Sequence, residues 1–236
     1  TAMAEAGACV VLTGRKRATL EAVAARITDS GGEALVVPGD VSKRGDHDRI
    51  GDAALDMRGR IDILVNNAGT NVRMPTEDYR EEDWDTVVNT NLKGTFFLTL
   101  LVARQMIKQS YGKIIHIASL ASITGLPNIS AYTAAKGGIG ALTYQMSIEW
   151  AKHNINVNAI CPGYIRTPLT QSVQDSERGT FIQGRIPMGR WGEPEDLAGP
   201  CIFLALKVVF LLKGLLATFF LQLILKSLQV FYSSTY

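Results

Sequence analysis

The sequence has few residues that bind metals or form disulfides. Three cysteines and three histidines occur among its 236 residues. Cys9, Cys161 and Cys201 lie far apart in apolar segments, so we expect buried free thiols in a reducing compartment. The cysteines and histidines lack the spacing of a metal site, and we expect His47 and His153 on helix surfaces. These absences argue against a zinc protein and against a secreted disulfide scaffold.

An excess of one charge is also missing. The net charge is +2, and acidic and basic residues are interspersed without a basic stripe, so nucleic acid is not an expected partner. Residues 1–6 lack the basic start and apolar centre of a signal peptide, and we expect a cytoplasmic protein. A hydrophobic content of 47% is enough for one domain of this length.

Apolar runs typical of buried strands alternate with segments of helical period. Ile61–Val65 is nearly all apolar, as buried parallel strands are, whereas the apolar residues of Ala18–Ser30 recur at helical spacing. This alternation predicts an α/β fold, a doubly wound parallel sheet with helices on both faces. We expect strands at 9–13, 34–37, 61–65, 113–117 and 155–161, and helices at 18–30, 44–58, 82–109, 130–153 and from about 193.

Tyr132 and Lys136 are spaced four residues apart in one expected helix, so their side chains share a face. A phenol titrates near pH 10, and a nearby ammonium lowers that pKa. Such a tyrosine can act as a general acid or base. Taken alone, the pair also fits two residues on a solvated helix face. Ser119 alone fits a strand-end cap, and Asn91 alone fits a residue at a helix kink.

The order of these residues resembles the classical short-chain dehydrogenase/reductase family. The matching positions are Asn66-Asn67-Ala68-Gly69, Asn91, Ser119, Tyr132 and Lys136, and Pro162-Gly163 after an apolar run. The resemblance covers about residues 1 to 205 and implies a Rossmann-like fold. Two stretches, Glu149–Ala159 and Arg190–Gly199, are similar to the branch of the family that acts on sugar acids such as gluconate and keto-deoxygluconate.

The resemblance implies a role for each catalytic residue. Tyr132 would exchange a proton with the substrate oxygen while hydride moves to or from a nicotinamide. Lys136 would bind the nicotinamide ribose and lower the pKa of Tyr132. Ser119 would orient the substrate oxygen, and Asn91 would hold a water linked to Lys136.

The resemblance also implies a nicotinamide cofactor, for which NADP is the first choice and NAD the second. Arg15 stands where NAD-selective members carry an acidic residue, and an arginine can pair with a 2′-phosphate. The alternative is that Arg15 is a solvated turn residue. The other cofactor positions implied are Asp40 and Val41 at the adenine, Asn67, Ala68 and Gly69 beside its ribose, Tyr132 and Lys136, and Pro162, Gly163, Ile165 and Thr167 beside the nicotinamide.

Both ends of the sequence depart from the family pattern. Residues 1–7 are interpreted as the end of the first family helix, so we expect the first strand, and the glycine loop that holds the pyrophosphate, to be missing. We also expect no last strand, because residues 206–236 form an apolar tail without family resemblance. Val208–Leu225 is just long enough for a membrane helix, but we favour non-native coding sequence and expect no membrane partner. The expected organisation is an incomplete Rossmann-like domain at 1–205 and a tail at 206–236.

Several functions share this residue set. We expect an NAD(P)-dependent oxidoreductase that acts on a small-molecule substrate, a sugar acid. A 3-oxoacyl-[acyl-carrier-protein] reductase would use the same catalytic residues, and a non-catalytic truncated gene product or a membrane-attached variant belongs to another class. The family also implies a homo-oligomer, a tetramer or dimer, built on the helices at 82–109 and 130–153.

Overall fold

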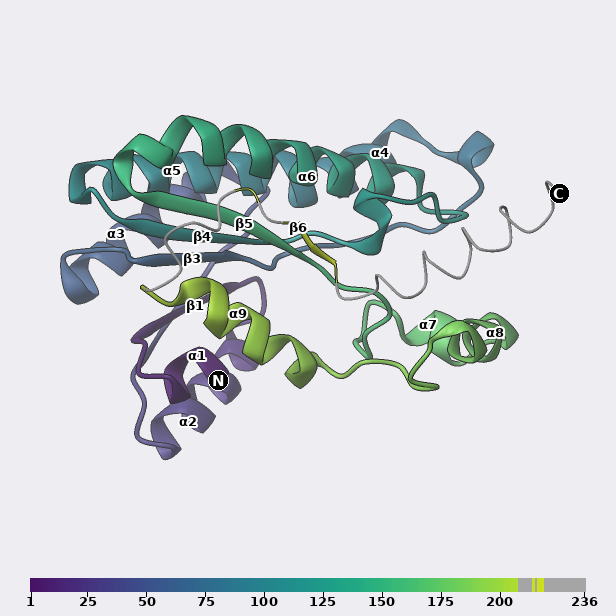
Figure 1. Ribbon diagram of the computed structural model, residues 1–236, viewed down its shortest axis with the longest axis horizontal. Coiled ribbons are helices and arrows are strands. Elements are labelled where there is room, and N and C mark those ends of the chain that lie inside the picture. Colours follow the sequence, from purple (N-terminus) through teal and green to yellow (C-terminus); the bar gives the residue numbers. More distant parts are fainter. Residues whose placement is uncertain (208–213, 215, 219–236) are drawn as a thin grey trace, which may run out of the picture.

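Parallel strands lie between two layers of helices (Figure 1). The computed structural model describes residues 1–207, 214 and 216–218. The strands are β1 (Val10–Gly14), β2 (Ala34–Pro38), β3 (Ile63–Asn66), β4 (Gly112–Ile117), β5 (Ile155–Cys161) and β6 (Leu216–Thr218). The α-helices are α1 (Ala2–Glu5), α2 (Arg17–Asp29), α3 (Arg44–Arg58), α4 (Glu81–Val88), α5 (Thr95–Gln109), α6 (Ser130–Trp150), α7 (Gln171–Gln174), α8 (Glu177–Arg185) and α9 (Ala198–Ala205). The α/β fold expected from the alternating pattern is confirmed.

The strands form two parallel sheets. One has the order β1-β2 and the other the order β3-β4-β5-β6. Pairing between β4 and β5 runs from Gly112 opposite Ile155 to Ile117 opposite Ile160. Within the described residues, β1 and β3 pair neither with each other nor with a common strand. This separation lies where the family pattern places its first strand.

The expectation that the sheet has no last strand is wrong. In the structure β6 pairs in parallel with β5, from Ala159 opposite Leu216 to Cys161 opposite Thr218, and the Gly214 N–H donates to the Val157 carbonyl at 2.9 Å. The outer edge of buried β5 carries backbone groups that need partners, and any extended segment can supply them. The rest of the expected membrane interval lies outside the described residues. In the described part, none of the helices is long and apolar enough to cross a bilayer.

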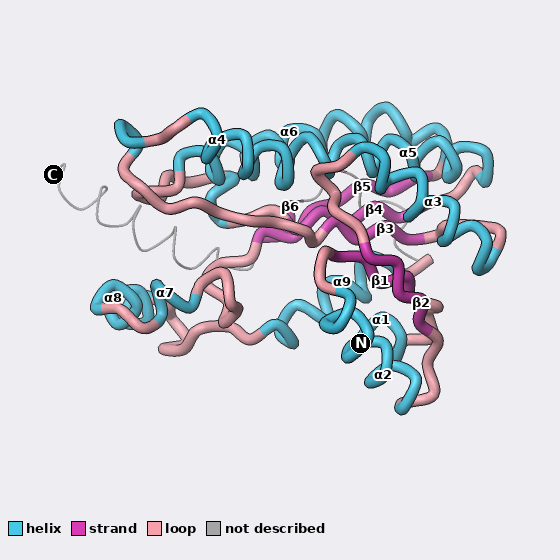
Figure 2. The backbone as a smooth tube through the Cα atoms, turned by 180° about the vertical axis from the view of Figure 1, so that it is seen from behind, coloured by secondary structure: helices cyan, strands magenta, loops and turns pink. Residues whose placement is uncertain are grey.

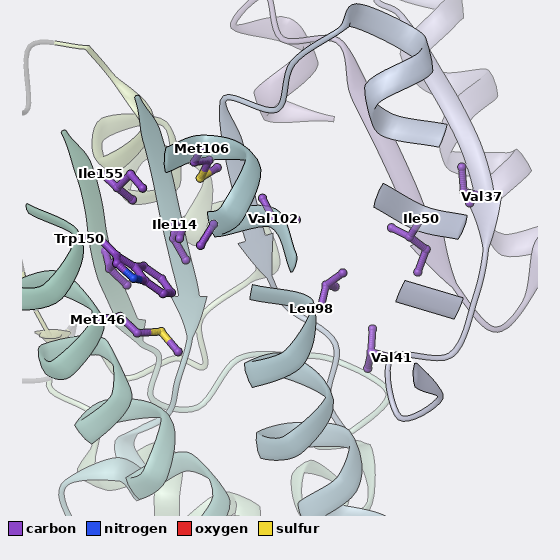
Figure 3. Packing of buried hydrophobic residues seen from close by; sticks show 12 residues of the cluster. Val37, Val41, Ile50, Leu98, Val102, Met106, Ile114, Met146, Trp150 and Ile155 are labelled. Carbon is purple, nitrogen blue, oxygen red and sulfur yellow. The ribbon is translucent and has the colours of Figure 1, made fainter. Parts of the chain in front are cut away.

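The largest core cluster lies between the sheet and the layer formed by α3, α5 and α6 (Figure 3). Met106 and Trp150 approach the sheet residues Ile114 and Ile155 there, and all four are buried. The opposite face of the sheet is covered by α9, whose Leu204 packs with Ile115 and Ile160. Viewed from behind, α1, α2 and α9 lie on the side opposite α4, α5 and α6 (Figure 2). Because both faces are covered, every residue of β5 is buried.

The single helix expected at 82–109 is interrupted by the π-helical turn η2 (Asn89–Gly94) between α4 and α5. Asn91 is buried in this turn. Gly94, the last residue of the turn, packs against the loop after β2. A Cβ added at Gly94 would lie only 2.2 Å from the Val41 carbonyl oxygen. The turn therefore requires glycine at this position, and it is the kind of local π distortion that accompanies functional sites.

Cys9 and His47 lie in surroundings opposite to those expected, and Cys201 is partly rather than fully buried. Cys9 is exposed rather than buried, because it precedes β1 and its sulfur lies 3.1 Å from Arg58 Nη2. His47 is only 2% exposed rather than on the helix surface. It lies on the face of α3 that packs against the loop after β2, where its Nε2 is 2.7 Å from the Val41 carbonyl.

Candidate active site

The expected site residues come together at the carboxyl ends of the strands. Asn67-Ala68-Gly69 follows β3, Ser119 follows β4, and Pro162-Gly163 follows β5. Because neighbouring parallel strands end at the same edge, these loops meet there. A cavity at this edge is lined by Ser119, Tyr132, Gly163 and Tyr164, with Asn71, Arg73 and Arg178 among the other lining residues.

Tyr132 and Lys136 lie one turn apart on α6, as their spacing predicts. The Lys136 Nζ atom is 5.7 Å from the centroid of the Tyr132 ring. Lys136 is 5% exposed, and burial lowers its pKa to about 8. Its ammonium donates to the Ile117 carbonyl at 2.5 Å. A buried amine with a lowered pKa is a group that can exchange protons near neutral pH.

The electrostatics at Tyr132 differ from the expectation that Lys136 lowers its pKa. Burial raises the pKa of Tyr132, and the groups that oppose this are the hydrogen-bonded Ser119 hydroxyl and the Arg73 guanidinium. The Lys136 ammonium lies over the face of the Tyr132 ring and donates to the Ile117 carbonyl at the end of β4. Ser119 and Arg73, rather than Lys136, are therefore the groups that favour the Tyr132 phenolate against the effect of burial.

Ser119 contacts both the backbone and the tyrosine. Its Oγ accepts a hydrogen bond from the Ala121 N–H at 3.1 Å and so caps the short turn η3 (Leu120–Ser122). The same side chain opposes the burial-induced rise in the pKa of Tyr132, with which it lines the cavity. The strand-end cap and the contact with the tyrosine therefore coexist in one residue, since the cap fixes the direction of the side chain.

Asn91 holds the loop after β3. Its Oδ1 accepts from the Thr70 N–H at 2.8 Å, and its Nδ2 donates to the Thr70 carbonyl at 2.8 Å. A Cβ added at Gly69 would lie 3.5 Å from Asn91 Oδ1 and 3.9 Å from Lys136 Nζ. The π-helical turn, the loop after β3 and α6 therefore meet behind Tyr132.

The other expected cofactor residues lie along the same edge. Arg15 follows β1, and Asp40 and Val41 follow β2. Burial raises the pKa of Asp40, but hydrogen bonds from Ser42 and the charges of Arg15 and Lys43 outweigh it and lower that pKa overall. The loop after β5 is held by three backbone contacts. The Pro162 carbonyl accepts a hydrogen bond from the Leu120 N–H, and Ile165 forms an isolated β-bridge with Gly192. The Thr167 N–H donates to the Thr170 hydroxyl.

The cavity also contains two arginines that the sequence did not indicate as site residues. Arg73 lies in the loop after β3 and Arg178 lies on α8. Burial of the guanidinium, together with the charge of Arg178, lowers the pKa of Arg73. Among the described residues, neither arginine forms an ion pair with a carboxylate. Nothing in the local sequence marks them, because single arginines in a loop and in a mixed helix are ordinary surface residues.

Lys136→Met is expected to stabilise the cofactor-free protein while removing activity. The folded-state pKa of Lys136 is about 8, below the unfolded value near 10.4. Below pH 8 both states hold the proton, so the folded state bears the full penalty of a buried charge, about 3 kcal/mol. Losing the bond to Ile117 offsets about 1 kcal/mol of this. The variant should therefore gain about 2 kcal/mol at pH 7.

The measurement is the free energy of unfolding in denaturant at several pH values. Wild type should become more stable as pH rises from about 8 to 10.4, because the unfolded state then binds more protons. Lys136→Met should lack this rise, and exposed Lys152→Met serves as the matched control. A Met variant that is less stable than wild type at pH 7 would contradict the buried-charge account.

Known proteins share this arrangement. The short chain dehydrogenase family model matches residues 1–178. The 2-dehydro-3-deoxy-D-gluconate 5-dehydrogenase of Dickeya dadantii is 46% identical over 182 residues, which are 76% of this chain and 72% of that relative. The enzyme of the same name from Escherichia coli is 50% identical over 156 residues, 65% of this chain and 62% of the relative.

A solved structure extends the likeness to three dimensions. A gluconate 5-dehydrogenase from Burkholderia cenocepacia, in complex with NADP and tartrate, superposes with a TM-score of 0.87 at 35% identity, covering 92% of this chain and 86% of that one. The family match, the shared fold and the meeting of Ser119, Tyr132 and Lys136 at the sheet edge lead to one conclusion. The chain belongs to the short-chain dehydrogenase/reductase family.

Proposed function

We propose that the protein is an NAD(P)-dependent oxidoreductase that interconverts a secondary alcohol and a ketone on a sugar acid. The observation that carries the proposal is the cavity itself. It places two hydroxyls suited to a reacting oxygen, Ser119 and Tyr132, beside two arginines without a carboxylate partner among the described residues. Arginine forks bind carboxylates through charge-assisted hydrogen bonds. The pair therefore favours an anionic substrate.

The chemistry follows from the residues that face the cavity. In the oxidative direction the Tyr132 phenolate takes the proton of the substrate hydroxyl as the carbonyl forms, and in the reductive direction Tyr132 returns it. Ser119, which lines the cavity beside Tyr132, orients the same substrate oxygen. When bound, the nicotinamide supplies or accepts the hydride. Asn91 fixes the loop after β3, which carries Asn67, Ala68 and Gly69 and along which the cofactor would lie.

The residues at this edge fit such a cofactor. The Lys136 ammonium has three donors, and the Ile117 carbonyl takes one of them, so the others can bind ribose hydroxyls. Gly69 lies beside this ammonium and allows the close approach of a sugar. NADP is the cofactor we favour, since the turn after β1 offers exposed Arg15 and Lys16 and carries no acidic residue. The similar structure from Burkholderia cenocepacia also holds NADP.

Arg15→Ala is expected to lower the preference for NADP over NAD by about tenfold. A guanidinium–phosphate contact at an exposed site is worth on the order of 1.4 kcal/mol, which is tenfold in binding. The measurement is kcat/KM for both cofactors, with Arg104→Ala, an exposed arginine on α5, as the control. Equal use of both cofactors by wild type, unchanged in the variant, would remove the assignment to NADP.

A substrate panel tests the proposed function. We expect turnover of six-carbon sugar acids and their keto forms with NADP, and slower turnover of 3-oxoacyl thioesters. A reductase of acyl thioesters would show the reverse order, and a non-catalytic protein would turn over none of these compounds although it contains the residues at the sheet edge.

The remaining assignments concern organisation. We propose that residues 1–205 make up the short-chain dehydrogenase domain and residues 206–236 a separate tail that contributes β6. We also propose a cytoplasmic homo-oligomer, a tetramer or dimer. Exposed apolar side chains on α4 and α6 support the oligomer: Trp84 is 40%, Tyr144 49% and Ile148 74% exposed. Light scattering of the purified chain tests the oligomeric state.

A further inference from the structure

Three side chains of α3 hold the loop that follows β2. Asp46 Oδ2 accepts from the Asp40 N–H at 2.7 Å, and Arg49 Nη1 donates to the Pro38 carbonyl. His47 lies between them on the helix, with its Nε2 atom 2.7 Å from the Val41 carbonyl oxygen. The backbone from Pro38 to Val41 is thus fixed at three points by one helix.

His47 is the buried member of this group. Its exposed fraction is 2%, whereas the side chains of Asp46 and Arg49 are 26% and 48% exposed. The His47 Nδ1 atom faces Arg44 Nη1 at 3.3 Å. Because a guanidinium can only donate, Nδ1 acts as the acceptor and Nε2 carries the hydrogen. The imidazole is therefore held in the tautomer that donates to Val41.

The Val41 carbonyl is confined from two sides. His47 approaches it from α3, and the η2 turn approaches from the other side, where an added Cβ on Gly94 would lie only 2.2 Å from the carbonyl oxygen. A buried carbonyl without a donor costs free energy. Loss of the His47 donor would therefore let the loop move away from η2.

We propose that His47 is a positioning residue for the adenine end of the cofactor. It acts through Val41, which it fixes against the η2 turn, and it needs no contact with the cofactor itself. The inference rests on the proposed NADP site, in which Asp40 and Val41 line the adenine. It assigns a binding role to a histidine that lies on α3, away from the residues that carry out the reaction.

The test compares two variants of similar length. His47→Gln keeps an amide that can donate to Val41, and His47→Met removes the donor. We expect His47→Met to raise the Kd of NADPH, and that of 2′,5′-ADP, by about tenfold, because one buried hydrogen bond is lost. His47→Gln should restore both Kd values to within about threefold of wild type, and kcat at saturating NADPH should stay within about twofold in both. His153→Met on the half-buried turn after α6 is the control.

Three outcomes separate the possible failures. If wild type binds NADPH and His47→Met binds it equally well, the positioning role is overturned and the proposed function stands. A fall in kcat with unchanged Kd also overturns it. If wild type binds neither NADPH nor 2′,5′-ADP, the proposed cofactor fails, and this inference fails with it.

A measurement on wild type guards against a Met variant that does not fold. The buried His47 Nε2–H should give a slowly exchanging proton signal in NMR spectra, assigned through its loss in His47→Gln. Adding 2′,5′-ADP should shift this signal, since the ligand would contact the loop that the proton holds. A signal that stays unchanged at saturating 2′,5′-ADP would overturn the proposal.

Discussion

Tyr132→Phe is expected to lower kcat by about a thousandfold while changing the Kd of NADPH by less than about threefold. Phenylalanine keeps the ring that packs beside Lys136 but removes the proton that the reaction transfers, and positioned general acids and bases typically contribute 10²- to 10⁴-fold. The Lys136 ammonium, which we propose binds the ribose, stays in place in this variant, because its hydrogen bond goes to the Ile117 carbonyl rather than to the phenol. Steady-state turnover and fluorescence titration of NADPH measure the two quantities separately.

Tyr144→Phe provides the matched control, since Tyr144 lies on the same helix and is 49% exposed. That variant should turn over at the wild-type rate. A Tyr132→Phe enzyme within about tenfold of wild type would exclude Tyr132 from the proton transfer. An equal loss in both variants would point to a change in α6 rather than to missing chemistry.

The pH dependence gives a second check on Tyr132. Burial raises the pKa of this phenol, against the opposing effects of Ser119 and Arg73. Alcohol oxidation needs the phenolate, so its rate should rise with pH through the alkaline range. Ketone reduction needs the protonated phenol, so its rate should fall over the same range. Tyr132→Phe should lose both trends, because no titrating group then remains at the substrate oxygen.

The order of elements was predictable because it depends on local pattern. The segment 155–161 alternates apolar and polar residues and is predicted as a strand, and β5 has these bounds. The spacing of Tyr132 and Lys136 places them on one face of α6 whatever the tertiary structure is. The loops that carry Gly69, Ser119 and Gly163 each follow a strand. Their meeting at one edge of the sheet was therefore predictable from the parallel order of the strands alone.

The features that could not be predicted depend on contacts between distant segments. His47 has the surroundings of a surface residue in the sequence, but the loop after β2 folds over it. In the π-helical turn, the side-chain amide of Asn91 bonds the Thr70 backbone, a contact between distant segments that the helical period does not predict. β6 forms because the outer edge of β5 accepts backbone partners, a property of the sheet and not of the tail sequence.

The cavity arginines show why substrate choice is harder to predict than chemistry. In the proposed reaction, Ser119 and Tyr132 must occupy fixed positions relative to the strands, because both would contact the reacting oxygen. A group that binds the far end of a substrate can come from any loop that reaches the cavity. Arg73 reaches it from the loop after β3, and Arg178 reaches it from α8. Their proposed shared role can be inferred only from their common position in the cavity.

Arg73→Met is expected to lower kcat/KM for a sugar acid by about thirtyfold. A hydrogen-bonded charge pair contributes on the order of 2 kcal/mol, which corresponds to that factor. Arg73 lines the cavity but is exposed to solvent, so the loss should stay below that of a fully buried pair. The neutral polyol of the same carbon skeleton lacks the carboxylate, and its kcat/KM should change by less than about threefold.

Arg73→Lys separates charge from geometry. An ammonium keeps the charge but lacks the planar fork that binds a carboxylate through two parallel bonds, so this variant should recover only part of the loss. Arg178→Met should also weaken the sugar acid selectively, and the double variant should lose less than the product of the two single effects, because both arginines would share one carboxylate. Each kcat/KM is measured for the sugar acid and the polyol side by side.

The polyol also distinguishes the two ways in which Arg73 can act. Besides lining the cavity, its guanidinium opposes the rise that burial causes in the pKa of Tyr132. If Arg73 served only the tyrosine, Arg73→Met would slow sugar acid and polyol oxidation equally and move the alkaline rise of both to higher pH. If it binds the carboxylate, the sugar acid loses far more than the polyol at every pH. Equal losses for the two substrates would therefore end the proposal that this cavity selects a sugar acid through Arg73.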